Sequence, residues 1–489
     1  MLAGIDVGST GLKVALFSEQ GQRLHYAYRE YSLSFLGGGQ VVIDPNCWWE
    51  CLCSCLKELS GQCDLRQVAG IAVSHANAII LADAQMQPIS PAIMQLDKRG
   101  AAMVPVIERD IGSDEIFRIT GNNNTDGFVW GPTLKWLAVN QPEDYKRVRY
   151  LFNPSSYLLM RLTGVYCMDH TRAATTMLYN PYKGEWDPDL CRYFGLTMEQ
   201  MPPLHKSSDI VGTTLADPAT GLPAGIPVAA GAMDTMAAVV GLGSGRQENA
   251  LIMGSVGRFV LAPRHLDRRF LNTVMPDRSA SASMTPVNNA GIAVRWARDI
   301  LFSNRPQGES CYDKLDHAAA AVSPGADGLL FMPYLTGASC PLWDSSVRGA
   351  FLHMEAYHKA GHLARAVLEG VGYTLADSFR ILHDEVGISD SPIYCGGGGS
   401  RSRVWMEILC NIFGQELIIP ENLETETIGC AILAGMGTGV LSKNDLATWN
   451  RAVRKITPDP EVHRFYTEQL KKFRAAYGLL QEAHRILDQ

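Results

Sequence analysis

The sequence is poor in the features that mark several large classes of protein. Charged residues make up only 19% of its 489 residues, and the formal net charge is −7. A chain without excess positive charge is not suited to bind nucleic acid or an anionic membrane surface by bulk electrostatics. No uncharged apolar run approaches the roughly 20 residues of a membrane span, and the most apolar stretch, near 224–243, contains Asp234. We therefore expect neither a nucleic-acid nor a membrane partner.

The sequence also lacks a basic leader before its first apolar stretch, which contains Asp6. This argues against a secretory signal. Five of the twelve cysteines crowd into 47–63, but without the paired Cys-x2-Cys spacing of a zinc site. Cys47, Cys51 and Cys55 recur every four residues, which predicts one face of a helix that starts near Pro45. We expect a soluble, cytoplasmic protein with reduced thiols.

Hydrophobic residues account for 46% of the chain, which fits a well-packed globular protein of two or three domains. The N-terminus predicts a strand that runs into Asp6, a tight turn over 8–11, and a second strand from Lys13. A third alternating segment over 24–28 completes an antiparallel meander. Helical and strand patterns then alternate, and 68–73 is typical of a buried strand. This order predicts the α/β class.

The opening pattern recurs near residue 250. An apolar run over 250–253, a turn over 254–257 and a second run over 259–261 predict another hairpin, about half the chain length after the first. We interpret this as two similar halves, each opening with a turn that offers backbone N–H groups. The alternative is that a long α/β protein contains two glycine-rich hairpins by chance.

A third glycine cluster, Gly396–Gly399, lies between a predicted strand over 393–395 and a predicted helix from about Ser402 to Phe413. Glycines between a strand and a helix let a nucleotide approach the backbone closely. A dinucleotide-dependent oxidoreductase is an alternative, but its fingerprint requires glycine where Ser402 stands. From Pro460 to the end, the apolar spacing predicts an amphipathic helix.

Asp6 lies where the first predicted strand meets its turn. Successive backbone N–H groups and the hydroxyls of Ser9 and Thr10 suit phosphate oxygens. A carboxylate there would repel phosphate unless a divalent cation lay between them, and Mg²⁺ prefers one or two carboxylates plus phosphates. Asp6 is therefore a candidate magnesium ligand, with Lys13 balancing charge. A hairpin with a solvated aspartate is the alternative.

Asp234 is the other carboxylate that the sequence singles out. It enters a stretch of small apolar residues over 229–238, where an unpaired buried charge is costly. Two interpretations remain open: an N-cap on a helix that begins near Thr235, or a catalytic base.

Seven segments match one family in their order and spacing. They are Gly4–Lys13, Leu96–Arg99, Arg161–Gly164, Gly231–Asp234, Gly254–Ser255, Ala366–Gly370 and Gly397–Trp405. Together they resemble the FGGY family of carbohydrate kinases, which has the sugar kinase–hexokinase–actin fold, and its xylulokinase-like members most. The sequence departs from the family pattern mainly around residues 75–78 and 95–99, on the acceptor side.

The resemblance implies an α/β fold of two similar actin/hexokinase-like (ribonuclease H-like) domains. Each would have a central mixed sheet flanked by helices, around a deep interdomain cleft. We expect residues 1–246 to bind the acceptor sugar and carry the first phosphate loop, and residues 247–489 to bind the nucleotide. The resemblance also implies ATP and Mg²⁺ as cofactors and a homodimer.

The resemblance assigns roles residue by residue. It implies that Asp6 binds the metal and that Asp234 is the general base beside the sugar. The implied nucleotide-binding residues are Gly8, Ser9, Thr10, Lys13, Gly254, Ser255, Gly397, Gly398 and Ser400. The implied acceptor-side residues are His75, Ala76, Asn77, Asp97 and Asp234.

These roles describe ATP-dependent phosphorylation of a hydroxyl of a small sugar or polyol, with a ketose such as a pentulose as the leading acceptor. Such a transfer needs an in-line acceptor oxygen, charge neutralisation on the γ-phosphate and a proton acceptor. The alternative is a catalytically silent sensor of sugar and nucleotide on the same fold. That alternative predicts loss of Asp6 or Asp234, and both are present.

Overall fold

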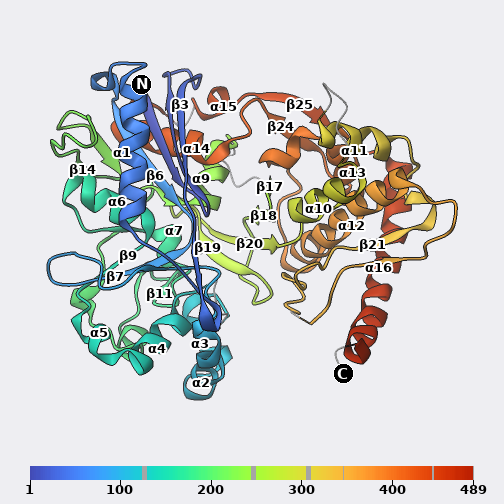
Figure 1. Cartoon of the computed structure of the whole chain (residues 1–489), viewed down its shortest axis with the longest axis horizontal. Coiled ribbons are helices and arrows are strands. Elements are labelled where there is room, and N and C mark those ends of the chain that lie inside the picture. Colours follow the sequence, from blue (N-terminus) through green and yellow to red (C-terminus); the bar gives the residue numbers. More distant parts are fainter. Residues whose placement is uncertain (124–128, 244–248, 304–309, 345, 443–444, 488–489) are drawn as a thin grey trace. The chain divides into compact units, whose positions relative to one another are not determined.

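The computed structural model describes residues 1–123, 129–243, 249–303, 310–344, 346–442 and 445–487. The chain forms two compact units (Figure 1). Unit 1 comprises Met1–Gly245, Leu266–Ala282 and Glu424–Arg451, and unit 2 comprises Arg246–His265, Ser283–Leu423 and Ala452–Gln489. The domain boundary predicted after residue 246 lies outside the described residues. The late segment Glu424–Arg451 belongs to unit 1, so a single boundary in the sequence does not separate the two units.

A mixed sheet forms the centre of unit 1. Its strand order is β14 (Ile210–Thr213), β15 (Pro227–Ala229), β6 (Gly70–His75), β1 (Leu2–Val7), β2 (Gly11–Phe17) and β3 (Arg23–Glu30), and β16 (Ala232–Met233) also pairs with β6. β1, β2 and β3 are antiparallel, which confirms the predicted meander. β6 runs parallel to β1, β15 and β16.

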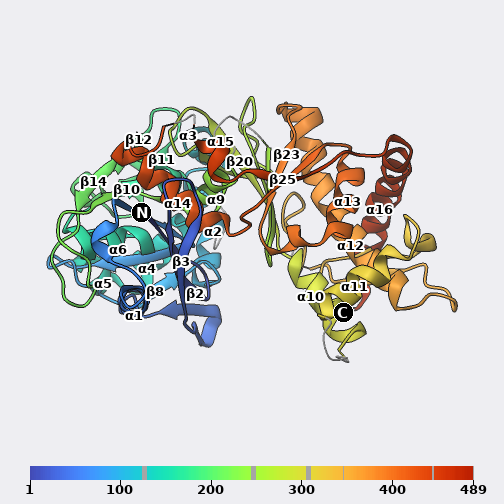
Figure 2. The same cartoon turned by 90° about the horizontal axis from the view of Figure 1, so that it is seen from above.

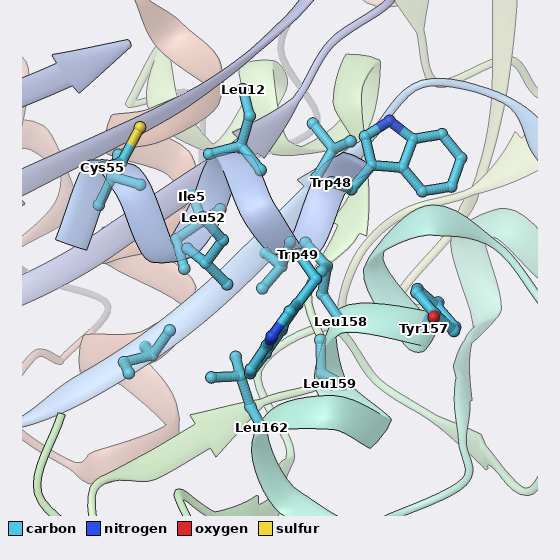
Figure 3. Packing of buried hydrophobic residues seen from close by; sticks show 14 of the residues in the cluster. Ile5, Leu12, Trp48, Trp49, Leu52, Cys55, Tyr157, Leu158, Leu159 and Leu162 are labelled. Carbon is cyan, nitrogen blue, oxygen red and sulfur yellow. The ribbon is translucent and has the colours of Figure 1, made fainter. Parts of the chain in front are cut away.

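The two faces of this sheet differ because successive side chains of a strand point in opposite directions. Ile5 and Leu12 point into an apolar layer with α1 (Asn46–Ser60) and α6 (Pro154–Thr163), where Trp48 and Trp49 are buried (Figure 3). The neighbouring side chain Asp6 therefore points to the opposite face. Helices α9 (Asp234–Gly241) and α14 (Thr425–Thr438) cover that face.

The predicted cysteine helix is α1, and Cys55 is buried in its apolar face while Cys47 and Cys51 are half-buried. A second sheet of unit 1, which the sequence analysis did not predict, has the order β4 (Ser34–Leu36), β5 (Gln40–Ile43), β8 (Ala92–Met94), β7 (Ala78–Ala82) and β9 (Tyr150–Phe152). The other elements of unit 1 are α2 (Val104–Asp110), α3 (Ser113–Thr120), α4 (Gly131–Asn140), α5 (Pro142–Arg147), α7 (His170–Ala173), α8 (Pro188–Tyr193), α15 (Leu446–Trp449), β10 (Met168–Asp169), β11 (Tyr179–Asn180), β12 (Glu185–Trp186), β13 (Leu204–His205) and β19 (Leu271–Val274).

Unit 2 has a central sheet with the order β20 (Ser281–Val287), β18 (Gly257–Leu261), β17 (Asn249–Met253), β23 (Ile393–Gly396), β24 (Leu417–Pro420) and β25 (Ala452–Ile456). α12 (Ala360–Arg380) packs against α10 (Gly291–Leu301), α11 (Cys311–Ala320) and α13 (Arg403–Phe413), as Figure 2 shows. The remaining elements are β21 (Leu330–Met332), β22 (Ala350–Leu352) and α16 (Pro460–Leu487). α13 and α16 confirm the two helices predicted here.

The two central sheets share one pattern. In each, three antiparallel strands are followed by two parallel neighbours and an antiparallel edge strand: β3-β2-β1-β6-β15-β14 and β20-β18-β17-β23-β24-β25. β1–β2 and β17–β18 occupy equivalent places, which confirms the predicted duplication. No helix within the described ranges combines the length and apolar character that crossing a membrane requires.

Candidate active site

Three polar side chains form a row across neighbouring strands of unit 1. Asp6 on β1 is paired with Lys13 on β2 and with Ser74 on β6. Residues directly opposite each other on adjacent strands point to the same face, so the register brings the three groups together. The Ser74 hydroxyl donates to Asp6 Oδ1 at 2.8 Å, and Lys13 Nζ lies 3.6 Å from Asp6 Oδ2.

Burial sets the electrostatics of this row. Asp6 is only 3% exposed. Burial raises its pKa, the positive charge of Lys13 and the Ser74 hydrogen bond oppose that rise, and the charge of Asp234 adds to it. Burial lowers the pKa of Lys13, but the attraction of Asp6, followed by that of Glu426, outweighs burial, and the net pKa is raised. Lys13 therefore carries a firmly held positive charge among carboxylates.

The turn after Asp6 holds the other predicted residues of the first loop. The Gly8 amide donates to the Gly11 carbonyl at 3.0 Å and closes the turn. Tyr31 anchors the turn from outside, because its hydroxyl donates to the Gly8 carbonyl and its amide to the Thr10 carbonyl. Ser9 is half-buried and Thr10 is exposed. Their side chains are thus available at the end of the strand that carries Asp6.

Asp234 is the first residue of α9, directly after β16, and the cap position is Met233. Its Oδ1 accepts from the amide of Thr235 at 2.6 Å and from the Thr235 hydroxyl at 3.0 Å. A capping carboxylate instead accepts from amides two or three residues further on. The N-cap interpretation of Asp234 is therefore wrong. Asp234 is half-buried, and its charge acts on Asp6, so the two carboxylates are electrostatic neighbours within unit 1.

A third carboxylate, Glu426, belongs to this group, and the sequence analysis missed it. It lies in the first turn of α14 and is half-buried. Burial raises its pKa to about 7, with further contributions from the charges of Asp6 and Asp234, while Lys13 opposes the rise. Glu426 could have been located from the sequence because it lies next to the small residues of α14. A run of small residues indicates a helix whose backbone packs closely against a neighbouring element.

Glycines let the backbone of α14 approach β1 and α9. A Cβ at Gly4 would overlap the carbonyl oxygen of Thr427, and a Cβ at Gly429 would overlap that of Ala237. Only glycine allows two backbones to approach this closely, because it has no Cβ. This packing fixes the first turn of α14, and with it Glu426, over the strand that carries Asp6.

The acceptor-side residues predicted from the sequence lie at the end of β6 and just beyond it. His75 is fully buried, and its Nε2 accepts from Arg172 Nε at 3.1 Å. The Ala76 amide donates to the Val7 carbonyl, which ties this segment to β1. Asn77 Oδ1 accepts from Trp130 Nε1 at 2.9 Å. The structure thus places His75, Ala76 and Asn77 next to the Asp6 row.

Asp97 is held differently. It is 1% exposed, and Arg99 binds both of its oxygens through Nε and Nη2, at 2.9 and 2.8 Å. Asp97 Oδ2 also accepts from the Val41 amide. The guanidinium of Arg99 lies over the Trp136 ring at 5.4 Å. In this arrangement Asp97 orients Arg99, and its direct contact with a sugar stays a prediction.

The predicted loops of unit 2 lie beside each other, because β17 and β23 are parallel neighbours and both loops follow these strands. Gly291 and Ile292 of α10 donate their amides to the carbonyls of Gly254 and Ser255. Arg295, which the sequence analysis missed, donates to Ser255 Oγ at 3.0 Å. This brings a cation to the loop that contains Gly254 and Ser255.

The adjacent loop contains Gly397, Gly398 and Ser400. Gly397 has φ +82°, and a Cβ there would press on the Met253 carbonyl, so the position requires glycine. A Cβ at Gly398 would meet nothing within 4 Å. Ser400 is buried, and its hydroxyl donates to the Gly396 carbonyl at 2.9 Å. Ser400 therefore shapes the loop, while Gly398 leaves space beside it.

The donor set suits Mg²⁺ held together with phosphates. Among the residues that the structure describes, no group of three or more His, Cys, Asp and Glu side chains is arranged to hold a metal by itself. Mg²⁺ in phosphate chemistry uses only one or two carboxylates, with waters and phosphate oxygens completing the shell. Asp6, with Asp234 as its neighbour, meets that requirement.

Comparison with known proteins identifies the family. Residues 1–241 match the N-terminal domain, and residues 258–438 the C-terminal domain, of the FGGY family of carbohydrate kinases. The chain is 31% identical to the xylulose kinase of Escherichia coli (strain K12) over 429 residues, or 85% of this chain and 86% of that protein. The chain belongs to the FGGY family of carbohydrate kinases. It is an enzyme that phosphorylates a sugar with ATP.

A solved structure and a second curated relative extend the comparison. The crystal structure of xylulose kinase from Rhodospirillum rubrum matches with a TM-score of 0.90 and 27% identity, covering 99% of each chain. The gluconokinase of Bacillus subtilis (strain 168) is 28% identical over 508 residues, covering 100% of this chain and 96% of that protein. The predicted two-domain α/β sugar kinase fold is thus confirmed.

Proposed function

We propose that Asp234 is the general base of the transfer and that Asp6 binds Mg²⁺ together with ATP phosphates. The observation that carries this proposal is the buried row of Ser74, Asp6 and Lys13, with Asp234 as its electrostatic neighbour. A bound Mg²⁺ would supply charge neutralisation on the phosphates. Lys13 adds a fixed positive charge beside Asp6.

In this mechanism, Asp234 accepts the proton of the acceptor hydroxyl while the oxygen of that hydroxyl forms a bond to the γ-phosphorus of ATP. The bond between that phosphorus and the β,γ-bridging oxygen breaks, and ADP leaves. Phosphoryl transfer requires little covalent chemistry of the protein, so positioning and charge dominate. The turn that begins at Gly8 and the hydroxyls of Ser9 and Thr10 are proposed to bind phosphate oxygens in unit 1.

In unit 2 we propose that Gly254 and Ser255 form the second phosphate loop, and that Gly397, Gly398 and Ser400 form the adenosine-side loop. The adjacency of the two loops, the open space at Gly398 and the cation of Arg295 support this assignment. A homodimer and a cytosolic location stay predictions from the sequence.

The acceptor is a small sugar or its derivative. A ketose such as a pentulose is the prediction from the sequence, and the relatives include both xylulose kinases and gluconokinases. On the acceptor side we propose His75, Ala76, Asn77 and Asp97 as lining residues. No observation favours the silent sensor, because Asp6 and Asp234 are both present and lie together.

The test is ATP consumption against a panel of pentuloses, hexuloses, polyols and aldonates, with Mg²⁺ titrated. We expect turnover with at least one acceptor. Asp6→Ala should lose activity and weaken the Mg²⁺ dependence of ATP binding. Silence with every acceptor, despite measurable sugar binding, would favour the sensor. An unchanged magnesium titration in Asp6→Ala would remove Asp6 from the metal site.

A further inference from the structure

Arg172 is a buried cation beside the proposed base. It lies on the short helix α7 (His170–Ala173) and is 2% exposed. The neighbouring Thr171 hydroxyl accepts from the Met233 amide at 3.0 Å, so α7 is fastened to the residue that precedes Asp234. His75, which Arg172 contacts, is paired with Met233 across β6 and β16. Arg172 therefore borders both Asp234 and the predicted acceptor side.

The hydrogen-bond partners of the guanidinium are neutral. Arg172 Nε donates to His75 Nε2 at 3.1 Å, and Nη1 donates to the Thr175 hydroxyl at 2.9 Å. Burial, followed by the charge of Arg172, lowers the pKa of His75 well below its usual value. His75 is thus a neutral imidazole whose Nε2 is an acceptor.

The nearby carboxylates do not form ion pairs with the guanidinium of Arg172. Asp169 Oδ1 accepts from the Thr171 hydroxyl and the Arg172 amide, and its Oδ2 is buried without a partner. Among the described parts of the chain, no carboxylate lies within 4.0 Å of the Arg172 guanidinium. Burial lowers the pKa of Arg172 to about 10, which the charges of Asp234 and Asp169 only partly offset.

One guanidinium nitrogen stays available. Arg172 Nη2 has no acceptor within the described ranges, yet it is not completely buried. It is therefore the guanidinium nitrogen whose hydrogen bonding a ligand oxygen would complete. Burying a charged guanidinium is costly unless an anion pairs with it, and arginine is suited to a carboxylate because its N–H groups match the two oxygens.

We propose that Arg172 binds a carboxylate of the acceptor, so that the substrate is a sugar acid, an aldonate or ketoaldonate, rather than a neutral ketose. The inference rests on the proposed function, because it places the acceptor beside Asp234. It replaces the pentulose predicted from the sequence with an anionic acceptor. Arg172 is a specificity-determining residue in this account, and His75 and Thr175 orient it.

Matched acceptor pairs test the inference in the wild-type enzyme. D-gluconate is compared with D-glucitol, and D-xylonate with D-xylitol and D-xylulose, by ATP-dependent turnover. A charge-assisted hydrogen bond corresponds to a preference of about 10- to 100-fold in kcat/KM for the acid. Turnover of the neutral members with no preference for the acids would overturn the inference and leave the proposed function intact.

Variants of Arg172 separate recognition from a structural role. Arg172→Gln should reduce the acid-to-neutral ratio of kcat/KM by about 10- to 100-fold, mostly through KM, and Arg172→Lys should restore part of it. Arg118→Gln, an exposed arginine of unit 1, is the control and should keep the wild-type ratio. An equal loss for acid and neutral acceptors in Arg172→Gln would mean that Arg172 only maintains the fold.

Binding without turnover keeps the two proposals distinguishable. In a thermal-shift titration without ATP, the acids should raise Tm of the wild-type protein more than their neutral partners do, and Arg172→Gln should lose this difference. If no acceptor is phosphorylated but the acids still bind selectively, the proposed roles of Asp6 and Asp234 fail, whereas carboxylate binding by Arg172 stands. If Arg172→Gln does not fold, the wild-type preference alone decides.

Discussion

Lys13 lies directly opposite Asp6 on the adjacent antiparallel strand, with its Nζ 3.6 Å from Asp6 Oδ2. The pair has one member almost fully buried and the other partly open. Since the pairing is fixed by strand register, replacing either side chain with a neutral one changes the charge at the end of β1.

Lys13→Met removes the positive charge and leaves Asp6 buried with Ser74 as its hydrogen-bond partner. We expect the apparent KM for ATP to rise at least about tenfold, since a charge-assisted contact is worth about 1.5–3 kcal/mol. Steady-state kinetics at saturating acceptor measures this. Lys13→Arg, which keeps the charge, is the matched control. An unchanged KM for ATP in Lys13→Met would show that this cation does not act on the phosphates.

Gly4→Ala tests the close packing of α14 on β1. The added methyl would overlap the Thr427 carbonyl, so the strand or the helix must shift, at a cost of about 1–3 kcal/mol or more. We expect a clearly lower Tm. Gly478→Ala on α16 is the control, because its methyl meets no atom within 4 Å and a helical alanine is favoured over glycine by about 0.5–1 kcal/mol. Equal Tm values for the two variants would refute the packing argument.

Glu426→Gln should change how stability depends on pH. Burial raises the pKa of Glu426 to about 7 in the folded protein, above its value of 4.5 in the unfolded chain. The folded state therefore holds the proton more tightly, and stability falls as pH rises from about 4.5 to about 7. The shift corresponds to at most about 3 kcal/mol.

Unfolding of the ligand-free protein between pH 5 and 8 measures this effect. Glu426→Gln should flatten the decline, whereas Glu461→Gln, an exposed carboxylate at the start of α16, should follow the wild type. A decline of the same slope in Glu426→Gln would mean that other groups cause it. Asp6 contributes with the same sign, since burial also raises its pKa.

Much of the fold was predictable because it follows from local patterns. Alternating apolar residues and turn glycines located the β1–β3 meander, and the recurrence at Gly254 located its counterpart in unit 2. α13 could be predicted because serine is a residue type that often caps a helix, and Ser402 stands at its start. In the structure the Ser402 hydroxyl accepts from the Trp405 amide.

The rest depends on long-range contacts. Glu426 reaches the Asp6 row only because Glu424–Arg451 returns to unit 1, and no local pattern marks that return. Arg172 lies on a four-residue helix that is too short for a periodic signal. The role of Asp234 was ambiguous because the sequence does not fix the first residue of α9. In the structure α9 begins at Asp234 itself, and Met233 holds the cap position.

The most direct test of the account is the turnover of Asp234→Asn with ATP and the best acceptor of the panel. The variant removes the proton acceptor and keeps the size of the side chain, so kcat should fall by about 100- to 10,000-fold. Acceptor and nucleotide, measured by thermal shift, should still bind. A kcat within a few-fold of the wild type would contradict the account, because the hydroxyl proton would then have another acceptor.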